Sequence, residues 1–293
     1  MVSSILLYMD TVMKKAIFTL AIGDENPMYR AALLSFEQYA KKVGADLIVS
    51  KEFHYPITIK DPQHTASPAW TEKLYIKELL KQYDRVLYVD ADIIIQPDAE
   101  NIFDVYDDVN TVYLFNEGEH LERQNVIDKI TSIMGPLDNW PAVNNSPVYY
   151  NLGCMLISKQ SRLFDIAKLE DLQLLCNHIK YYEQTYVNYL LHRDGLAHQS
   201  ISPKFNRMDF MGPKNYRDAS FIHYAGRGYS NSSLKREVRF VNDFCELFKG
   251  HIDDQVLADI KQSGWDLFIN KVQQRYKLPK PIINAIAKRF VTI

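Results

Sequence analysis

Short apolar runs alternate with segments of helical periodicity in the first part of the chain. Residues 16–22 form an apolar run that ends in a turn signal, and residues 46–50 form a second run. Both predict buried strands of a parallel sheet. Between them apolar residues recur at helical spacing, with Asn26 placed to cap a helix, Pro27 to begin it and Gly44 to end it. Strand, helix and strand together predict a right-handed βαβ unit.

The alternation continues along the chain. Residues 51–69 contain three prolines and predict a surface loop, residues 71–83 a helix, and residues 85–89 a core strand. Further strands are expected at 111–115, 148–158 and 221–224, and further helices at 162–178 and 182–192. The sequence contains no internal repeat and no low-complexity linker. We therefore expect one α/β domain over residues 14–250.

Composition and charge exclude several classes of protein. The 293 residues carry 34 basic and 36 acidic side chains and are 47% hydrophobic. This near balance argues against a dedicated nucleic-acid binder, and the apolar content argues against a disordered chain. Three widely spaced cysteines, at positions 154, 176 and 245, form no disulfide framework or metal-binding pattern. They favour a reducing compartment, and we expect a cytoplasmic protein.

The two ends of the chain differ from the middle. Residues 1–12 lack the features of a signal peptide, and our hypothesis is that they are an upstream extension preceding the true start. No apolar run is long enough to span a bilayer. Residues 251–293 are expected to form a helical, basic tail, in which residues 267–293 carry six basic side chains and no acidic one. Such a helix either contacts an anionic membrane surface or packs on its own domain. Nothing in the sequence indicates an oligomeric state.

The sharpest local signal is a pair of carboxylates after a core strand. Asp90 and Asp92 are two residues apart directly behind the run 85–89. Alternate residues of an extended backbone point to the same side, so both side chains are expected to converge at the carboxyl edge of the sheet, where α/β folds bind ligands. Two such charges repel each other unless a cation intervenes, and Mn²⁺ or Mg²⁺ suits oxygen ligands. The alternative is a pair of solvated turn residues.

A family resemblance begins at this pair. The segment Tyr88–Asp92 resembles the Asp-x-Asp motif of glycosyltransferases with the GT-A fold. Four further blocks, in matching order, resemble glycosyltransferase family 8: residues 150–157, 183–188, 203–208 and 223–226. The resemblance covers residues 16–226. It implies a GT-A, Rossmann-like fold with a mixed, mainly parallel central sheet flanked by helices.

The resemblance also implies a donor and its ligands. The donor would be a UDP-sugar, and Mn²⁺ or Mg²⁺ would bridge its diphosphate to Asp90, Asp92 and His223. The other residues that the resemblance places at the donor are Thr19, Ala21, Asp24 and Tyr29 at the base and ribose, Lys73 over the donor, Asn151 at the sugar and Gly226 beside the histidine. Three of these assignments have plain alternatives: a turn role for Asp24, an exposed position for Lys73, and a structural role for His223.

The same resemblance bears on stereochemistry. Gln184 lies, in the family, on the face of the donor sugar opposite the leaving group, and the family retains anomeric configuration. An amide is a feeble nucleophile, which favours front-face attack by the acceptor hydroxyl. Glu183 keeps a double displacement open, or is simply a carboxylate favoured at a helix start. We therefore expect transfer of a hexose to a glycan or lipid-linked acceptor, with Gln184, Glu183 and Asp92 as the catalytic group.

One departure from the family is visible. The family commonly continues the histidine block with Lys-Pro-Trp, whereas Tyr229 stands at the position of the lysine. Arg227 is our candidate for the missing cation, because a guanidinium suits phosphate. Two alternatives remain open. One is a nucleotidyltransferase that makes the sugar nucleotide, although residues 23–26 are a poor version of its Gly-rich phosphate loop, and the other is a non-catalytic sugar-nucleotide or glycan-binding module. A phosphatase of the haloacid dehalogenase type fits poorly, because it would have the acidic pair near the N-terminus followed by Thr or Val, whereas Ile94 stands two residues after the pair.

Overall fold

A six-stranded mixed sheet is the centre of the molecule. A computed structural model describes residues 13–23, 26–60 and 66–290, and the proposed extension at residues 1–12 lies outside them. Within the sheet the strands run in the order β2-β1-β3-β8-β5-β9. Their bounds are β1 Lys15–Leu20, β2 Asp46–Ser50, β3 Arg85–Val89, β5 Val112–Asn116, β8 Tyr150–Ser158 and β9 His198–Ser200. Strand β1 pairs in parallel with β2 and β3, β8 runs antiparallel between β3 and β5, and β9 is parallel to β5. The expected mixed α/β class is confirmed.

The first βαβ unit forms as its sequence predicts. Helix α1 (Pro27–Val43) begins after Asn26, whose Oδ1 accepts the backbone N–H of Met28 at 2.9 Å. It ends at Gly44, which has a φ of 65°, a left-handed conformation that glycine adopts without strain. Strand β1 has one face toward α1 and the other toward the opposite layer, because Ile17 and Phe18 belong to separate core clusters. A local unit with clear caps is therefore predictable from sequence.

Two predicted helices differ in the structure. The segment expected as one α-helix over 71–83 is a 3₁₀ helix η1 (Pro68–Tyr75) followed by one turn of α2 (Ile76–Leu79). The buried carboxylate of Glu72 accepts backbone N–H groups of His54 and Tyr55 at 2.8 and 2.7 Å, which fixes this tighter segment to the preceding loop. The helix expected over 162–178 is broken into α5 (Leu163–Ile166) and α6 (Leu169–Leu175), because Ala167 is extended. Helix α7 (Tyr182–Arg193) forms as predicted.

A second, three-stranded sheet sits beside the end of β3. It pairs β10 (Arg207–Met208), β11 (Phe221–His223) and β4 (Ile93–Ile95), with β11 antiparallel to β4. The remaining elements are α3 Ile102–Val105, α4 Gln124–Met134, the strand pair β6 Ala142–Val143 and β7 Ser146–Pro147, and the 3₁₀ turns η2 Glu117–Glu119, η3 Pro203–Phe205, η4 Asp209–Met211, η5 Tyr216–Asp218 and η6 Ser233–Lys235. The small sheet matters most, because it joins distant parts of the chain at one site.

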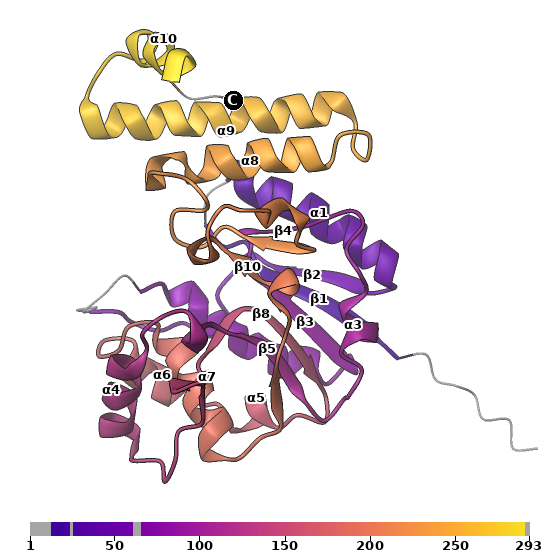
Figure 1. Cartoon of the computed structure of the whole chain (residues 1–293), viewed down its shortest axis with the longest axis vertical. Coiled ribbons are helices and arrows are strands. Elements are labelled where there is room, and N and C mark those ends of the chain that lie inside the picture. Colours follow the sequence, from indigo (N-terminus) through magenta and orange to yellow (C-terminus); the bar gives the residue numbers. More distant parts are fainter. Residues whose placement is uncertain (1–12, 24–25, 61–65, 291–293) are drawn as a thin grey trace, which may run out of the picture.

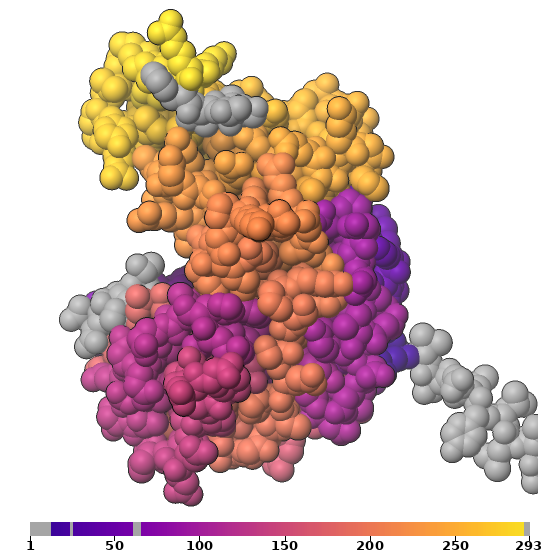
Figure 2. Space-filling model, viewed as in Figure 1, coloured from indigo at the N-terminus to yellow at the C-terminus, as the bar shows by residue number. Residues whose placement is uncertain are grey.

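Three C-terminal helices stack outward from α1, and the last of them lies on the far side of α9 (Figure 1). They are α8 (Arg236–Leu247), α9 (Asp254–Tyr276) and α10 (Lys280–Phe290), and both α8 and α9 contact α1. The surface is indented on one side, between the orange part of the chain and the lobe below it (Figure 2). The division of the chain at residue 250 stays a prediction. In the described ranges, every helix is too short or too polar to cross a bilayer.

Candidate active site

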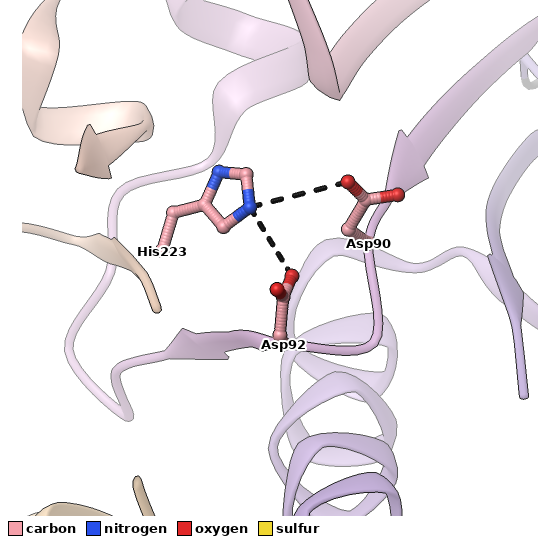
Figure 3. Close-up of side chains that lie close together, drawn as sticks. All are labelled: Asp90, Asp92 and His223. Atoms are coloured by element: carbon pink, nitrogen blue, oxygen red, sulfur yellow. Dashed lines mark ion pairs between the residues drawn. The ribbon is translucent and has the colours of Figure 1, made fainter. Parts of the chain in front are cut away.

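Two carboxylates and one imidazole meet where β3 ends. Nε2 of His223 lies 3.1 Å from Oδ1 of Asp92 and 3.9 Å from Oδ2 of Asp90 (Figure 3). One ligand atom from each of the three residues lies within 4.8 Å of the others. The structure therefore brings together the three residues that the sequence analysis names as metal ligands.

A turn, followed by strand pairing, creates this convergence. Asp90 and Asp92 lie in a turn between β3 and β4, where the backbone N–H of Ile93 bonds to the carbonyl of Asp90 at 3.1 Å. The expected reason, alternation along an extended strand, is thus wrong, although the convergence itself is observed. The antiparallel register places His223 opposite Ile93, and the N–H of Tyr224 bonds to the carbonyl of Asp92 at 2.9 Å. The small sheet thereby carries the imidazole to the carboxylates.

In each carboxylate, one oxygen contacts residues outside the three-residue cluster and the other points toward its centre. Oδ1 of Asp90 accepts the hydroxyl of Tyr88 at 2.5 Å and lies 3.7 Å from Nζ of Lys73. Oδ2 of Asp92 accepts a guanidinium N–H of Arg236. The other oxygen of each residue faces the histidine, and Oδ1 of Asp92 is buried with no hydrogen-bond donor in the described part of the chain. The inward atoms are therefore free to bind a cation.

A chain of amides fixes the tautomer of the histidine. Both oxygens of Glu117 act as acceptors, and Glu117 forms an ion pair with Arg123 at 2.6 Å. Asn151 donates to Glu117 at 3.1 Å, so its own oxygen accepts from Asn206 at 3.0 Å. The oxygen of Asn206 is then left to accept Nδ1–H of His223 at 2.8 Å. A proton on Nδ1 leaves the lone pair of Nε2 directed at the carboxylates, as metal ligation requires.

Electrostatics at the site also favour a bound cation. Burial alone would raise the pKa of Asp92, but the charges of His223 and Arg236 hold it below its usual range. Burial alone would lower the pKa of His223, yet attraction to the charges of Asp92 and Asp90 raises it. In the absence of a metal the histidine thus draws a proton toward the carboxylates, and a divalent ion replaces that proton with more charge.

The donor set fits a hard divalent ion. Two carboxylate oxygens and one imidazole nitrogen suit Mn²⁺ or Mg²⁺. Neighbouring ligands on such an ion are about 3 Å apart when each bond is about 2.1 Å, which matches the 3.1 Å between His223 and Asp92. Gly153 of β8 makes room for them: a Cβ there would lie 2.3 Å from Cε1 of His223 and 2.9 Å from Oδ2 of Asp90. The backbone of β8 can pass under the cluster because this position has no side chain.

Lys73, Glu183 and Gln184 surround the cluster on the side of α7. Lys73 is buried, which rules out the exposed alternative, and its Nζ lies 3.1 Å from Oε1 of Glu183. Burial alone would lower the pKa of Lys73, but Asp90 and Glu183 raise it, so the side chain stays charged. Gln184 donates to Glu117 at 2.9 Å, and its carbonyl accepts the backbone N–H of Leu152 at 3.3 Å. Gln184 is therefore held in place by bonds at both ends of its amide.

Two of the predicted nucleotide contacts border a cavity of about 690 Å³ between the end of β1, α1 and α9. Ala21 and Tyr29 line it from one side, and Ser263 and Asn270 of α9 line it from the other. Burial, and then the charges of Asp92 and Asp90, raise the pKa of Tyr29. Thr19 is fully buried with no hydrogen-bond partner for its hydroxyl in the ranges described, and it does not line this cavity.

Two further predicted contacts, Gly226 and Arg227, meet Asp209 in the described part of the chain. Gly226 is exposed with a φ of 62°, and a Cβ there would lie 3.3 Å from a carboxylate oxygen of Asp209. Arg227 is exposed, and its backbone N–H donates to the same carboxylate at 3.1 Å. Asp24 lies outside the described residues.

Sequence reasoning missed several residues that the structure places at or behind the cluster. Arg236 contacts Asp92 from a helix start with no motif around it. Glu117 and Arg123 lie in a segment with no recognisable pattern. Asn206 belongs to a matched block, so its position gave a signal, but its role as the acceptor for the histidine depends on a contact that spacing does not reveal.

Comparison with known proteins places the chain in a family. The sequence model of glycosyl transferase family 8 matches residues 1–228. A glycosyltransferase involved in the glycosylation of the major capsid of PBCV-1 has a similar structure, with a TM-score of 0.51 and 16% identity over 78% of this chain and 98% of the other. An active-site mutant of LgtC has a TM-score of 0.50 and 16% identity over 82% and 98% of the two chains. Comparison with curated proteins finds no match. Because the family model covers most of the chain and the fold agrees, this chain belongs to glycosyltransferase family 8 and has the GT-A fold.

Proposed function

We propose that this protein transfers a hexose from a UDP-sugar to a hydroxyl of a glycan or lipid-linked acceptor, with a divalent metal and with retention of configuration. The observation that carries the proposal is the convergence of Asp90, Asp92 and His223 with their outer atoms already bonded. Such a site holds its ligand atoms in place before an ion arrives, which lowers the cost of binding. It stands beside a cavity large enough for a nucleoside.

Asp90, Asp92 and His223 would hold the ion, Mn²⁺ in preference to Mg²⁺ because one ligand is an imidazole nitrogen. When bound, the ion neutralises negative charge that grows on a diphosphate as the glycosidic bond breaks. Tyr88 and Lys73 hold Asp90 from outside, and Lys73 also balances Glu183. Lys73 thus contributes one positive charge between two carboxylates of the site.

Retention is supported by the environment of Gln184. Its amide is engaged by Glu117 on one side and by the backbone of Leu152 on the other, so it is neither nucleophilic nor free to move. Oε2 of Glu183 is buried without a hydrogen-bond partner in the described ranges, while Oε1 is paired with Lys73. Ion pairing makes Glu183 a weak nucleophile. We favour front-face attack, in which the acceptor hydroxyl passes its proton to the departing phosphate oxygen.

The test is a panel of sugar nucleotides incubated with the protein and Mn²⁺, with release of nucleoside diphosphate as the readout. One UDP-sugar is expected to be hydrolysed slowly without acceptor, and Asp92→Asn is expected to abolish release while the fold survives. Asp98→Asn, an exposed carboxylate after β4, is the matched control and should keep full activity. Tight binding of a donor without any turnover would instead identify a binding module. Product anomers read by NMR test retention.

A peripheral membrane contact through residues 267–293 is part of the proposal, within a cytoplasmic location. Ile283 of α10 is buried against α9, whereas Ile282 and Ile286 are each 50% exposed. The sequence of the segment carries six basic side chains, namely Lys271, Arg275, Lys277, Lys280, Lys288 and Arg289. Exposed apolar side chains in a basic segment suit an anionic lipid surface. Helix α10 thus packs on its own protein and still presents an apolar edge.

A further inference from the structure

Arg236 is a cation at the candidate site that lies beyond the residues matched by the family model. It is the first residue of α8, and two bonds orient its guanidinium. One N–H donates to Oδ2 of Asp92, and Nε–H donates to the carbonyl of Tyr224 at 2.7 Å. Tyr224 directly follows His223, so Arg236 bonds to backbone beside one ligand and to the carboxylate of another.

The loop before α8 packs against the aliphatic part of this side chain. A Cβ at Gly228, which has a φ of 54°, would lie 2.9 Å from Cγ of Arg236. The side chain of Arg236 nevertheless remains 24% exposed. A guanidinium has five N–H donors, and the bonds to Asp92 and Tyr224 use two of them. Arg236 therefore has spare donors with access to solvent at the rim of the cluster.

The bond to Asp92 leaves the ligand atom open. Arg236 takes Oδ2, while Oδ1 faces Nε2 of His223 at 3.1 Å. A cation bound by the inward atoms can thus coexist with Arg236 in its present position. The positive charge of Arg236 then lies beside the cluster and next to solvent. A diphosphate bound at this rim would need a second cation there.

The other basic residues near the site are less suited to this task. Lys73 is buried and already paired with Asp90 and Glu183. Arg227, the cation expected from the sequence, is exposed, and its backbone N–H donates to the carboxylate of Asp209. Tyr229 is no cation, and its hydroxyl donates to the carbonyl of Arg207.

The cavity lies at the same edge of the sheet as the cluster. Ala21 and Tyr29 line it where β1 ends, and β1 is the parallel neighbour of β3, which ends at the aspartate pair. A nucleoside diphosphate with its nucleoside in this cavity would therefore have its phosphates near the cluster, where Arg236 bonds to Asp92.

We propose that Arg236 binds the diphosphate of the donor directly, as a catalytic residue that acts beside the metal ligands. The assignment rests on the proposed function, because it takes a nucleoside diphosphate as the ligand. Arg236 pairs with Asp92 when the donor is absent and offers its spare N–H groups to phosphate oxygens when the donor is bound. A guanidinium is well matched to two phosphate oxygens at once.

The experiment measures binding of Mn²⁺ alone, and of UDP and uridine each with Mn²⁺, by calorimetry. The variants are Arg236→Ala and Arg236→Lys. Arg239→Ala on the same helix, where the side chain is exposed and 3.8 Å from Asp243, is the matched control. Arg236→Ala should weaken UDP binding at least tenfold and leave uridine binding unchanged. Its affinity for Mn²⁺ without nucleotide should stay within threefold of the wild-type value. The UDP affinity of Arg236→Lys should fall between those of Arg236→Ala and the wild type, and the UDP affinity of Arg239→Ala should match the wild type.

Three results would overturn the assignment. Unchanged UDP binding in Arg236→Ala would show that the guanidinium does not reach the phosphates. Equal losses for uridine and UDP would show a structural role. A loss of UDP binding no larger than the loss for Mn²⁺ alone would show that Arg236 only positions Asp92. The proposed function is tested separately with Asp92→Asn: if this variant binds Mn²⁺ as tightly as the wild type, the metal site and the proposed function fail, whatever Arg236→Ala shows.

Discussion

Replacing Gly153 with alanine tests whether the three ligand atoms must keep their present positions. The new Cβ would lie 2.3 Å from Cε1 of His223, whereas carbon atoms in contact are about 3.5–4.0 Å apart. The imidazole has to shift by about 1 Å, yet it is 2% exposed and bonded to Asn206, so no free space receives it. We expect a destabilisation of about 1–3 kcal/mol from overpacking. We also expect Mn²⁺ binding to weaken at least tenfold, because sites tolerate displacements of only about 0.5 Å.

Calorimetric titration with Mn²⁺ and urea unfolding of Gly153→Ala separate the two effects. Gly264→Ala on α9 is the control, since its Cβ would meet Val241 at 3.1 Å, far from the ligands. The control should change the free energy of unfolding without changing Mn²⁺ affinity. Wild-type Mn²⁺ affinity in a folded Gly153→Ala protein would refute the reasoning, because the cation would then not be bound by the groups above this glycine.

Three further changes test other parts of the structure. Asn206→Leu leaves the buried Nδ1–H of His223 without an acceptor, which costs about 1–3 kcal/mol, and should weaken Mn²⁺ binding about 10–100-fold in titrations; unchanged affinity would contradict the amide relay. Burial lowers the pKa of His192 to about 4, so the unfolded state binds a proton first as the pH falls, and stability present above about pH 6.5 is lost toward pH 4. In His192→Gln, the free energy of unfolding from urea melts should no longer fall by this roughly 1–3 kcal/mol across that pH range. An equally steep fall in the variant would show that His192 is not its cause. Replacing Ile282 and Ile286 with aspartate should reduce partitioning to anionic vesicles, and unaltered partitioning would reject the membrane contact.

The sequence predicts those parts of the fold whose determinants are local. The cap at Asn26, the stop at Gly44 and the apolar run 85–89 each act within a few residues, and each element forms as expected. The segment around Glu72 does not, because its geometry is fixed by backbone groups in the preceding loop. Helical spacing indicates that such a segment turns, but it does not separate a 3₁₀ helix from an α-helix.

The residues of the candidate site also differ in how far the sequence reveals them. Asp90 and Asp92 are conspicuous in the sequence, because two carboxylates follow an apolar strand. His223 entered through its likeness to a family block, and the antiparallel pairing of β11 with β4 explains its place. Arg236 and Glu117, which hold the ligands from behind, carry no local signal, because they act through contacts with distant segments. Their roles become visible only when the chain is folded.

The direction of the hydrogen bonds behind the histidine depends on one end of the relay. An amide can be turned either way in isolation, so Asn206 alone does not decide which nitrogen of His223 carries the proton. Glu117 decides it, since both of its carboxylate oxygens act as acceptors, one toward Asn151 and the other toward Arg123. Each amide between Glu117 and the histidine must then donate its N–H toward Glu117 and accept a hydrogen bond on the side of the histidine. The tautomer that leaves Nε2 open toward Asp92 is thus set by a charge three hydrogen bonds away.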